Sequence, residues 1–139
     1  MSSRTKSRKR AVDALYAGQL RDVMATDLLD ETKDSVADRE NQEEIFSFAK
    51  QLVEGVLLNQ AEIDELISSL AQNWTLDRMP AVDLAILRLA CFEMAFSSET
   101  PAEVVISEAV SLAKEISTDE SPTFINGILA AVAATRKPI

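Results

Sequence analysis

The segment from about Arg78 to Phe96 is apolar nearly all the way round a helix, and it constrains the fold more than any other part of the chain. A helix of this kind does not lie on a surface with one side in water; it is buried in the core, with other elements packed around it. The rest of the chain must therefore supply elements that cover it. Its apolar residues include Val82, Ala85, Ile86, Leu87, Leu89, Ala90, Cys91, Phe92, Met94 and Phe96.

Amphipathic segments on both sides of this one supply such elements. In each of them apolar residues recur every three or four positions, which indicates a helix with one buried face. A polar, acidic stretch over about 25–41 predicts a loop, with a short helical turn near Leu28 and Leu29. The predicted helices run from within the first ten residues to about Met24, then about Gln42–Asn59, Ala61–Ala71, Arg78–Phe96, Thr100–Ile116 and Ser121–Thr135.

Turn-forming residues are too rare for an all-β fold. Only 3 glycines and 4 prolines occur in the chain, and a β fold of this length needs more turns than they supply. A length of 139 residues suits one compact domain. We therefore predict an all-α protein of six to seven helices, with a single domain over residues 1–139.

Three helix starts carry recognisable capping signals. Asp77 is a predicted N-cap, with Pro80 in the first turn of the helix that follows. Thr100 and Ser121 each stand directly before a proline, the pattern of a capping residue followed by proline at the first helical position. These signals place the starts of the last three helices.

Gly55 and Gly127 lie inside predicted helices and call for a structural reason. Gly55 costs about 1 kcal/mol relative to alanine, so we expect it to pack closely against another helix. Asn126 and Gly127 are adjacent poor helix formers in the last helix. We expect Gly127 to permit a close helix contact and Asn126 to satisfy a backbone group across it.

Three charged residues interrupt the apolar segment. Arg88 and Glu93 are about 140° apart on a helix, so they cannot easily pair with each other. We expect each to have a partner on a neighbouring element, with a lysine such as Lys114 as the partner of Glu93. Asp83 is expected to be exposed, either as a solvated charge or as a contact for a partner.

The residue inventory argues against an enzyme. There is no histidine, the commonest general base and metal ligand, and no glycine-rich phosphate loop. The one cysteine, Cys91, excludes an intramolecular disulfide, and its apolar surroundings favour a small buried hydrophobe over a nucleophile. We expect no cofactor and no metal. The sequence shows neither a secretory signal nor a membrane span, so we expect a cytoplasmic protein.

The first ten residues form a basic arm in an acidic protein. They hold five basic side chains and no acidic one, so removing them from the net charge of −9 leaves −14 on the rest. A nucleic acid would therefore be held at one place, by phosphate contacts that release counterions. The alternative is a solubilising tail. The basic residues are Arg4, Lys6, Arg8, Lys9 and Arg10.

Phe124 is a second candidate for nucleic-acid binding. It lies one turn inside the last predicted helix, near the positive end of the helix dipole. An exposed aromatic ring there can stack on a base while backbone N–H groups meet a phosphate. Packing in the core fits the spacing of Phe124 equally well, so both roles remain open.

Taken in order along the chain, these residues resemble the NusB family of bacterial transcription antitermination factors. The similarity spans nearly the whole length, and the order and spacing of its motifs make it specific. The matching motifs are Arg10-Ala11-Val12-Asp13-Ala14-Leu15-Tyr16, Arg78, Pro80-Ala81-Val82-Asp83, Ile86-Leu87-Arg88-Leu89-Ala90, Glu93, Pro101, Val104-Val105-Ile106, Glu108-Ala109-Val110, Leu112-Ala113-Lys114 and Phe124-Ile125-Asn126-Gly127-Ile128-Leu129.

The resemblance implies a fold of two three-helix bundles packed together. It implies binding to single-stranded boxA RNA of nascent ribosomal RNA leader transcripts, together with ribosomal protein NusE, in an RNA polymerase antitermination complex. By position it assigns Tyr16 and the basic arm to the RNA-binding region and Phe124 to a later RNA surface. Asp83 would face the ribosomal protein.

Two other functions are compatible with the sequence. The first is a protein-interaction module or homodimer that does not bind RNA by itself. The second is an enzyme, because NusB-like domains occur attached to RNA cytosine methyltransferases; that function needs a catalytic domain beyond Ile139.

Overall fold

Every regular element among the described residues is helical, which confirms the all-α prediction. A computed structural model describes residues 2–33, 41–71, 74–97 and 99–135. None of the helices in these ranges is both long and apolar enough to cross a membrane. The elements are α1 (Ser3–Arg21), α2 (Ala25–Glu31), α3 (Gln42–Leu70), the short 3-10 helix η2 (Leu76–Arg78), α4 (Ala81–Ala95), α5 (Ala102–Ile116) and α6 (Ser121–Thr135).

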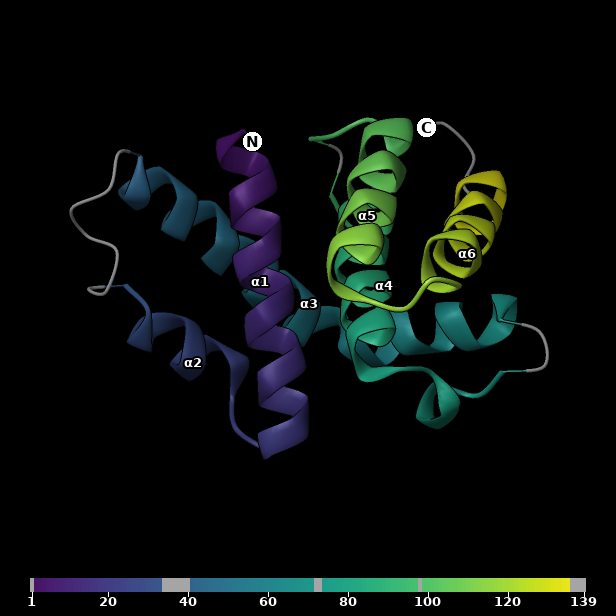
Figure 1. The fold of residues 1–139 in the computed structure, drawn as a ribbon, viewed down its shortest axis with the longest axis horizontal. Coiled ribbons are helices and arrows are strands. Elements are labelled where there is room, and N and C mark those ends of the chain that lie inside the picture. Colours follow the sequence, from purple (N-terminus) through teal and green to yellow (C-terminus); the bar gives the residue numbers. More distant parts are fainter. Residues whose placement is uncertain (1, 34–40, 72–73, 98, 136–139) are drawn as a thin grey trace.

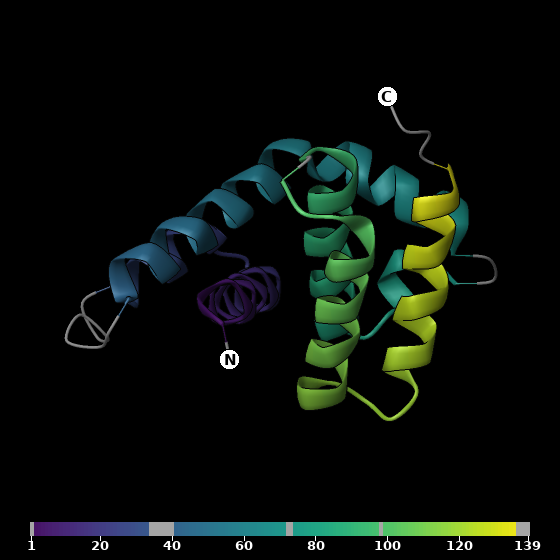
Figure 2. The same cartoon turned by 90° about the horizontal axis from the view of Figure 1, so that it is seen from above.

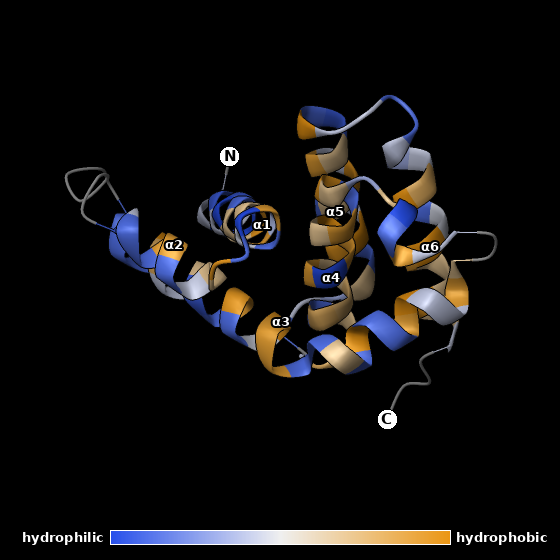
Figure 3. Cartoon of the chain, turned by 90° about the horizontal axis from the view of Figure 1, so that it is seen from below, coloured by the Kyte–Doolittle hydropathy of each residue, from blue (hydrophilic) through white to orange (hydrophobic). Residues whose placement is uncertain are grey.

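The helices form two halves that share α3. α1, α2 and the first half of α3 lie on one side, and α4, α5 and α6 lie on the other with the second half of α3 (Figure 1). From above, α3 runs along one side of the molecule behind both halves (Figure 2). Hydrophilic and hydrophobic residues alternate along it, as expected of a helix with one buried face (Figure 3). This arrangement agrees with the two packed bundles implied by the resemblance.

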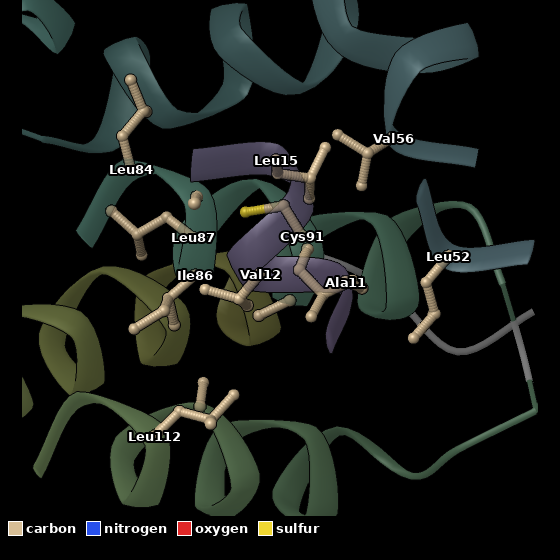
Figure 4. Close-up of a cluster of buried hydrophobic side chains, with 14 of the residues drawn as sticks. Ala11, Val12, Leu15, Leu52, Val56, Leu84, Ile86, Leu87, Cys91 and Leu112 are labelled. Carbon is tan, nitrogen blue, oxygen red and sulfur yellow. The ribbon is translucent and has the colours of Figure 1, made fainter. Parts of the chain in front are cut away.

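α4 occupies the centre, as its apolar sequence predicts. It packs against α1, α3, α5 and α6. Figure 4 shows Ile86, Leu87 and Cys91 of α4 among side chains from α1, α3 and α5. Leu87 and Cys91 are completely buried. One continuous core thus runs through both halves and fixes α1 against α4 and α5.

The prediction of two helices over 42–71 is wrong, because a single helix, α3, spans Gln42–Leu70. No glycine or proline separates the two predicted segments, and Val56 and Ile63, both fully buried, are two turns apart on the same face. The side chain of Asn59 donates to the carbonyl oxygen of Gly55 at 2.8 Å, within the same helix. Asn59 therefore lies within the helix instead of ending it.

The predicted capping residues are also wrong, because α4 and α5 begin after a proline in extended conformation. Pro80 and Pro101 are the N-cap residues, and neither start has a side-chain cap. The carbonyl oxygen of Pro80 accepts the amide of Leu84 at 3.0 Å, which closes the first turn of α4. Asp77 belongs to η2, and the side chain of Ser121, inside α6, is bonded elsewhere.

The acidic stretch contains a longer helix than predicted. α1 ends at Arg21, where Asp22 takes a left-handed conformation with φ of 54°. α2 then covers Ala25–Glu31 and buries Leu28 and Leu29, which confirms helical structure at these two residues. The loop predicted beyond it falls mostly on residues 34–40, outside the described part of the chain.

The two glycine predictions have opposite outcomes. A Cβ atom at Gly55 would lie 2.1 Å from Cζ of Phe92, so the expected close packing is confirmed. A Cβ at Gly127 would meet nothing within 4 Å, and both Asn126 and Gly127 are exposed. The structural roles expected for these two residues are therefore wrong, since they lie on the solvent side of α6.

Cys91 is a buried thiol that we expect to be unreactive. Burial, and to a lesser degree the charge of Asp64, raises its pKa to about 12. Only the thiolate reacts with disulfide reagents, so Ellman's reagent at pH 8 should titrate no thiol in the native protein and one thiol per chain in denaturant. Rapid reaction of the folded protein would contradict this burial.

Candidate nucleic-acid interface

The basic arm is the first part of α1 and not a free tail. The helix starts at Ser3, and the side-chain oxygen of Ser2 accepts a hydrogen bond from the amide of Thr5 at 3.1 Å, a regular N-cap. The five cations therefore have fixed positions around a helix. Which of them reach solvent depends on the side of the helix that each occupies.

Arg8 points into the protein. Its side chain is 5% exposed, and its Nε and Nη2 donate to the two carboxylate oxygens of Glu93 at 2.8 and 2.9 Å. Nη1 donates to Glu108 at 3.1 Å. Burial works against the charge, but the bonds to both carboxylates outweigh it, so the pKa of Arg8 is raised. The expected exposure of Arg8 to RNA and the pairing of Glu93 with Lys114 are both wrong.

This buried cluster joins the two halves of the molecule. Arg8 belongs to α1, Glu93 to α4 and Glu108 to α5. The hydroxyl of Thr5 also donates to Glu108, at 2.6 Å. Removing one member of such a cluster leaves an uncompensated buried charge, which is strongly destabilising. The cluster therefore anchors the basic helix in place, and Glu93 has a partner on a neighbouring helix, as predicted, but that partner is Arg8.

Arg4, Lys6 and Lys9 are the cations on the solvent side. Arg4 and Lys6 are exposed, and the guanidinium of Arg4 lies 3.7 Å from the centroid of the Phe48 ring. Lys9 is half-exposed and donates to Glu115 at 2.7 Å, which raises the pKa of Lys9. Exposed ion pairs of this kind contribute little and are readily exchanged. All three charges are therefore accessible to a polyanion.

Arg10 carries a charge that no carboxylate in the described ranges neutralises. It donates to the side chain of Gln42 at 3.2 Å and to the hydroxyl of Thr32 at 2.7 Å, both uncharged. Partial burial lowers its pKa, but an arginine stays protonated at neutral pH. Arg4, Lys6, Lys9 and Arg10 together are called the basic surface of α1 below.

Tyr16 lies two turns further along α1 than Lys9. It is partly buried and packs against the core. Its assignment to RNA rests on the resemblance and stays a prediction.

Phe124 lies beside an exposed tryptophan that the sequence analysis did not single out. Trp74 is 48% exposed, and its ring meets that of Phe124 edge-on, with centroids 5.9 Å apart and planes at 61°. Phe124 itself is partly buried in the first turn of α6. Trp74 is the only tryptophan of the chain and stands in a polar junction, outside any apolar stripe. That isolation is the signal that could have identified it.

Asp83 is buried instead of exposed. It is 2% exposed, and its carboxylate accepts hydrogen bonds from the hydroxyls of Ser117 at 2.5 Å and Ser121 at 2.8 Å. The expected surface position is therefore wrong. The side of α4 that carries Asp83 faces the connection between α5 and α6, which spacing along one helix does not reveal.

Arg88 has the partners on neighbouring helices that were predicted for it. Its Nε and Nη2 donate to the carboxylate of Asp64 in α3 at 2.8 and 2.9 Å, and Nη1 donates to Gln19 in α1 at 3.0 Å. Arg88 therefore links α4 to both helices. Among the described residues, no group of three His, Cys, Asp or Glu side chains is placed to hold a metal ion.

The shared long helix, the central apolar helix and the basic start of α1 define a small helical protein of two packed bundles. Its family is identified by direct comparison. The NusB family model matches residues 5–134, so the chain belongs to the NusB family.

Relatives with curated names agree over the full length. Transcription antitermination protein NusB of Clavibacter michiganensis subsp. michiganensis is 46% identical over 136 residues, covering 98% of this chain and 99% of the relative. The protein of the same name from Acidothermus cellulolyticus is 46% identical over 139 residues, covering 100% and 92%. The family membership thus extends to transcription antitermination as the general role.

Solved structures show the same fold. NusB of T. maritima superposes with a TM-score of 0.85 at 34% identity, covering 99% of this chain and 95% of that one. A chain from a crystal structure of NusB and NusE in complex with dsRNA superposes with a TM-score of 0.85 at 27% identity, covering 98% and 99%.

Proposed function

We propose that this protein binds single-stranded boxA RNA of nascent ribosomal RNA leader transcripts together with NusE, within an RNA polymerase antitermination complex. The similarity to a NusB chain crystallised with NusE and dsRNA supports RNA and NusE as partners. The family supports the role in antitermination. In this role the protein is an adaptor with no reaction of its own.

The basic surface of α1 is the observation that carries the proposal. The protein has a net charge of −9, yet four cations stand on the first turns of one helix, with Arg8 and its carboxylates fixing that helix to α4 and α5. Lys9 and Arg10 lie three and four residues after Lys6, so both flank it on the same broad side of α1. This surface is suited to hold an RNA backbone, while the acidic remainder repels it elsewhere.

The direct test is RNA binding with and without NusE, on boxA and on scrambled RNA of equal length. We expect tighter binding to boxA and a further gain when NusE is present. With about four phosphate contacts, the log–log slope of affinity against salt should be roughly −3. Equal affinity for the two RNAs in both conditions would contradict the proposal, and a homodimer that occludes the basic surface would appear as RNA binding that falls with protein concentration.

Lys6→Ala should weaken RNA binding without affecting folding, because the side chain is exposed and makes no ion pair with a described residue. One lost phosphate contact should reduce the salt slope by about 0.7 and the affinity at 0.1 M salt by roughly fivefold. Fluorescence anisotropy with labelled RNA measures both quantities.

Arg21→Ala is the matched control for Lys6→Ala. Arg21 is exposed at the far end of the same helix, so its removal changes the net charge equally. We expect the salt slope of this variant to equal that of the wild type. A similar loss in both variants would mean that overall charge, and not the basic surface of α1, governs binding.

A further inference from the structure

Trp74 and Phe124 form two walls of a small open pocket at the start of α6. The pocket has a volume of about 110 Å³, and Pro80, Thr118 and Ser121 complete most of its lining. Trp74 stands two residues before η2, whereas Phe124 lies in the first turn of α6, 50 residues further along the chain. The tertiary fold therefore brings the two rings together.

The arrangement of the two rings leaves the tryptophan available for stacking. The contact with Phe124 is edge-on, so it does not cover the indole as a stacked ring would. About half of Trp74 is in contact with solvent, although tryptophan is highly buried on average. An unpaired base of single-stranded RNA is a flat aromatic group that stacks on such a side chain.

The polar part of the lining suits a base better than a purely apolar ligand. Thr118 and Glu120 are exposed at the pocket and carry hydrogen-bond acceptors. Acceptors of this kind can bind the amino group of a cytosine, adenine or guanine base. The chemistry of the pocket therefore fits one unstacked base that bears an amino group.

A buried carboxylate holds the pocket together. Asp83 lies in the first turn of α4 and accepts hydrogen bonds from Ser117, just after α5, and from Ser121, the first residue of α6. Ser121 also bonds the hydroxyl of Thr118 at 2.7 Å. Asp83 forms no ion pair with a described residue, so these hydroxyls are its main compensation for burial. The network fixes the first turn of α6, and with it Phe124, against the start of α4.

We propose that the pocket between Trp74 and Phe124 binds a single unstacked RNA base, and that Asp83 is the positioning residue that keeps its two walls in register. The proposal rests on the proposed function, because RNA binding is its premise. It assigns Trp74 a direct contact with RNA and gives Asp83 an indirect role in place of a surface contact.

Trp74 reports on the pocket directly, because it is the only tryptophan in the protein. Titration of the wild-type protein with single-stranded boxA RNA should quench its emission, with the same Kd as fluorescence anisotropy gives. Trp74→Ala should weaken binding by about 5- to 150-fold, and Trp74→Phe should restore much of the loss. The salt slope should stay unchanged, since no phosphate contact is removed.

A double-mutant cycle between protein and RNA identifies the stacked base. Single abasic substitutions along the RNA should reveal one position whose loss weakens binding to the wild type but has no further effect on Trp74→Ala. If every abasic substitution weakens binding equally in both proteins, the pocket does not hold a base.

The two proposals can fail separately. If the wild type binds RNA with the expected salt slope, but RNA does not quench Trp74 and Trp74→Ala does not weaken binding, the pocket proposal fails and the proposed function stands. Absence of RNA binding by the wild type overturns both.

Two substitutions separate the positioning role of Asp83 from a general effect on folding. Asp83→Asn keeps the shape and one acceptor oxygen, so its affinity should stay close to that of the wild type. Asp83→Leu removes both acceptors and should lose the coupling between Trp74 and the stacked base, at an unchanged salt slope. Helicity by circular dichroism and acrylamide quenching of Trp74 check that each variant is folded before RNA is added. If folded Asp83→Leu keeps the coupling between Trp74 and the stacked base, Asp83 is not a positioning residue. If neither variant folds, Asp83 acts on overall stability and the positioning role is also overturned.

Discussion

Replacing Arg8 with methionine should lower the free energy of unfolding by about 3–5 kcal/mol. The guanidinium is buried and bonded to both oxygens of Glu93 and to Glu108. Methionine fills much of the same space but cannot donate, so Glu93, itself 4% exposed, would remain as a buried charge without its partner. Urea unfolding followed by circular dichroism measures the loss.

Lys6→Met is the matched control, because it removes one positive charge from the adjacent turn of the same helix at an exposed position. Its stability should change by less than about 0.5 kcal/mol. A second comparison isolates the buried charge: combining Arg8→Met with Glu93→Leu should cost less than Arg8→Met alone, because the buried carboxylate of Glu93 is then absent and Glu108, which is more exposed, still accepts from Thr5. This account would be contradicted if Arg8→Met and Lys6→Met lowered the free energy of unfolding equally. It would also be contradicted if the double variant were less stable than Arg8→Met alone.

The different positions of these two cations show where sequence reasoning stops. Arg8 and Lys6 belong to the same basic run, and composition treats them alike. What separates them is Glu93 and Glu108, which lie 85 and 100 residues further along the chain. A count of charges predicts that the start of α1 is basic. Which cations reach solvent depends on long-range pairing that the local sequence does not contain.

Helices and the central position of α4 were predictable because their signals are local. The spacing of apolar residues within one segment determines its buried face, and an apolar pattern all round places α4 in the core. The burial of Asp83 and the contact of Trp74 with Phe124 were not predictable in this way. Both depend on how the start of α4 meets the start of α6, which only the folded chain defines.

Gly55 and Gly127 illustrate the same limit. Both are glycines inside amphipathic helices, and the sequence suggests one explanation for both, a close helix contact. Of these two glycines, only Gly55 makes a close helix contact, because Phe92 occupies the space that a side chain would take. The same substitution at the two sites should therefore have opposite effects on stability.

Gly55→Leu should destabilise the protein by about 3 kcal/mol, because the new side chain would have to displace the Phe92 ring. Gly127→Leu should instead stabilise it by roughly 0.8 kcal/mol, since leucine is the better helix former and nothing occupies the space beside Gly127. Thermal and urea unfolding of the two variants test the difference in sign.

A third variant identifies the cause of the loss at Gly55. Phe92→Ala removes the ring whose Cζ, Cε1 and Cε2 atoms lie within 2.6 Å of the position of the added Cβ. In that background Gly55→Leu should cost much less than in the wild type, because the two substitutions share one space and their effects are coupled. If Gly55→Leu lowers the free energy of unfolding equally in both backgrounds, a clash with Phe92 is not the cause of the loss. The glycine would then be required by the backbone of α3 itself.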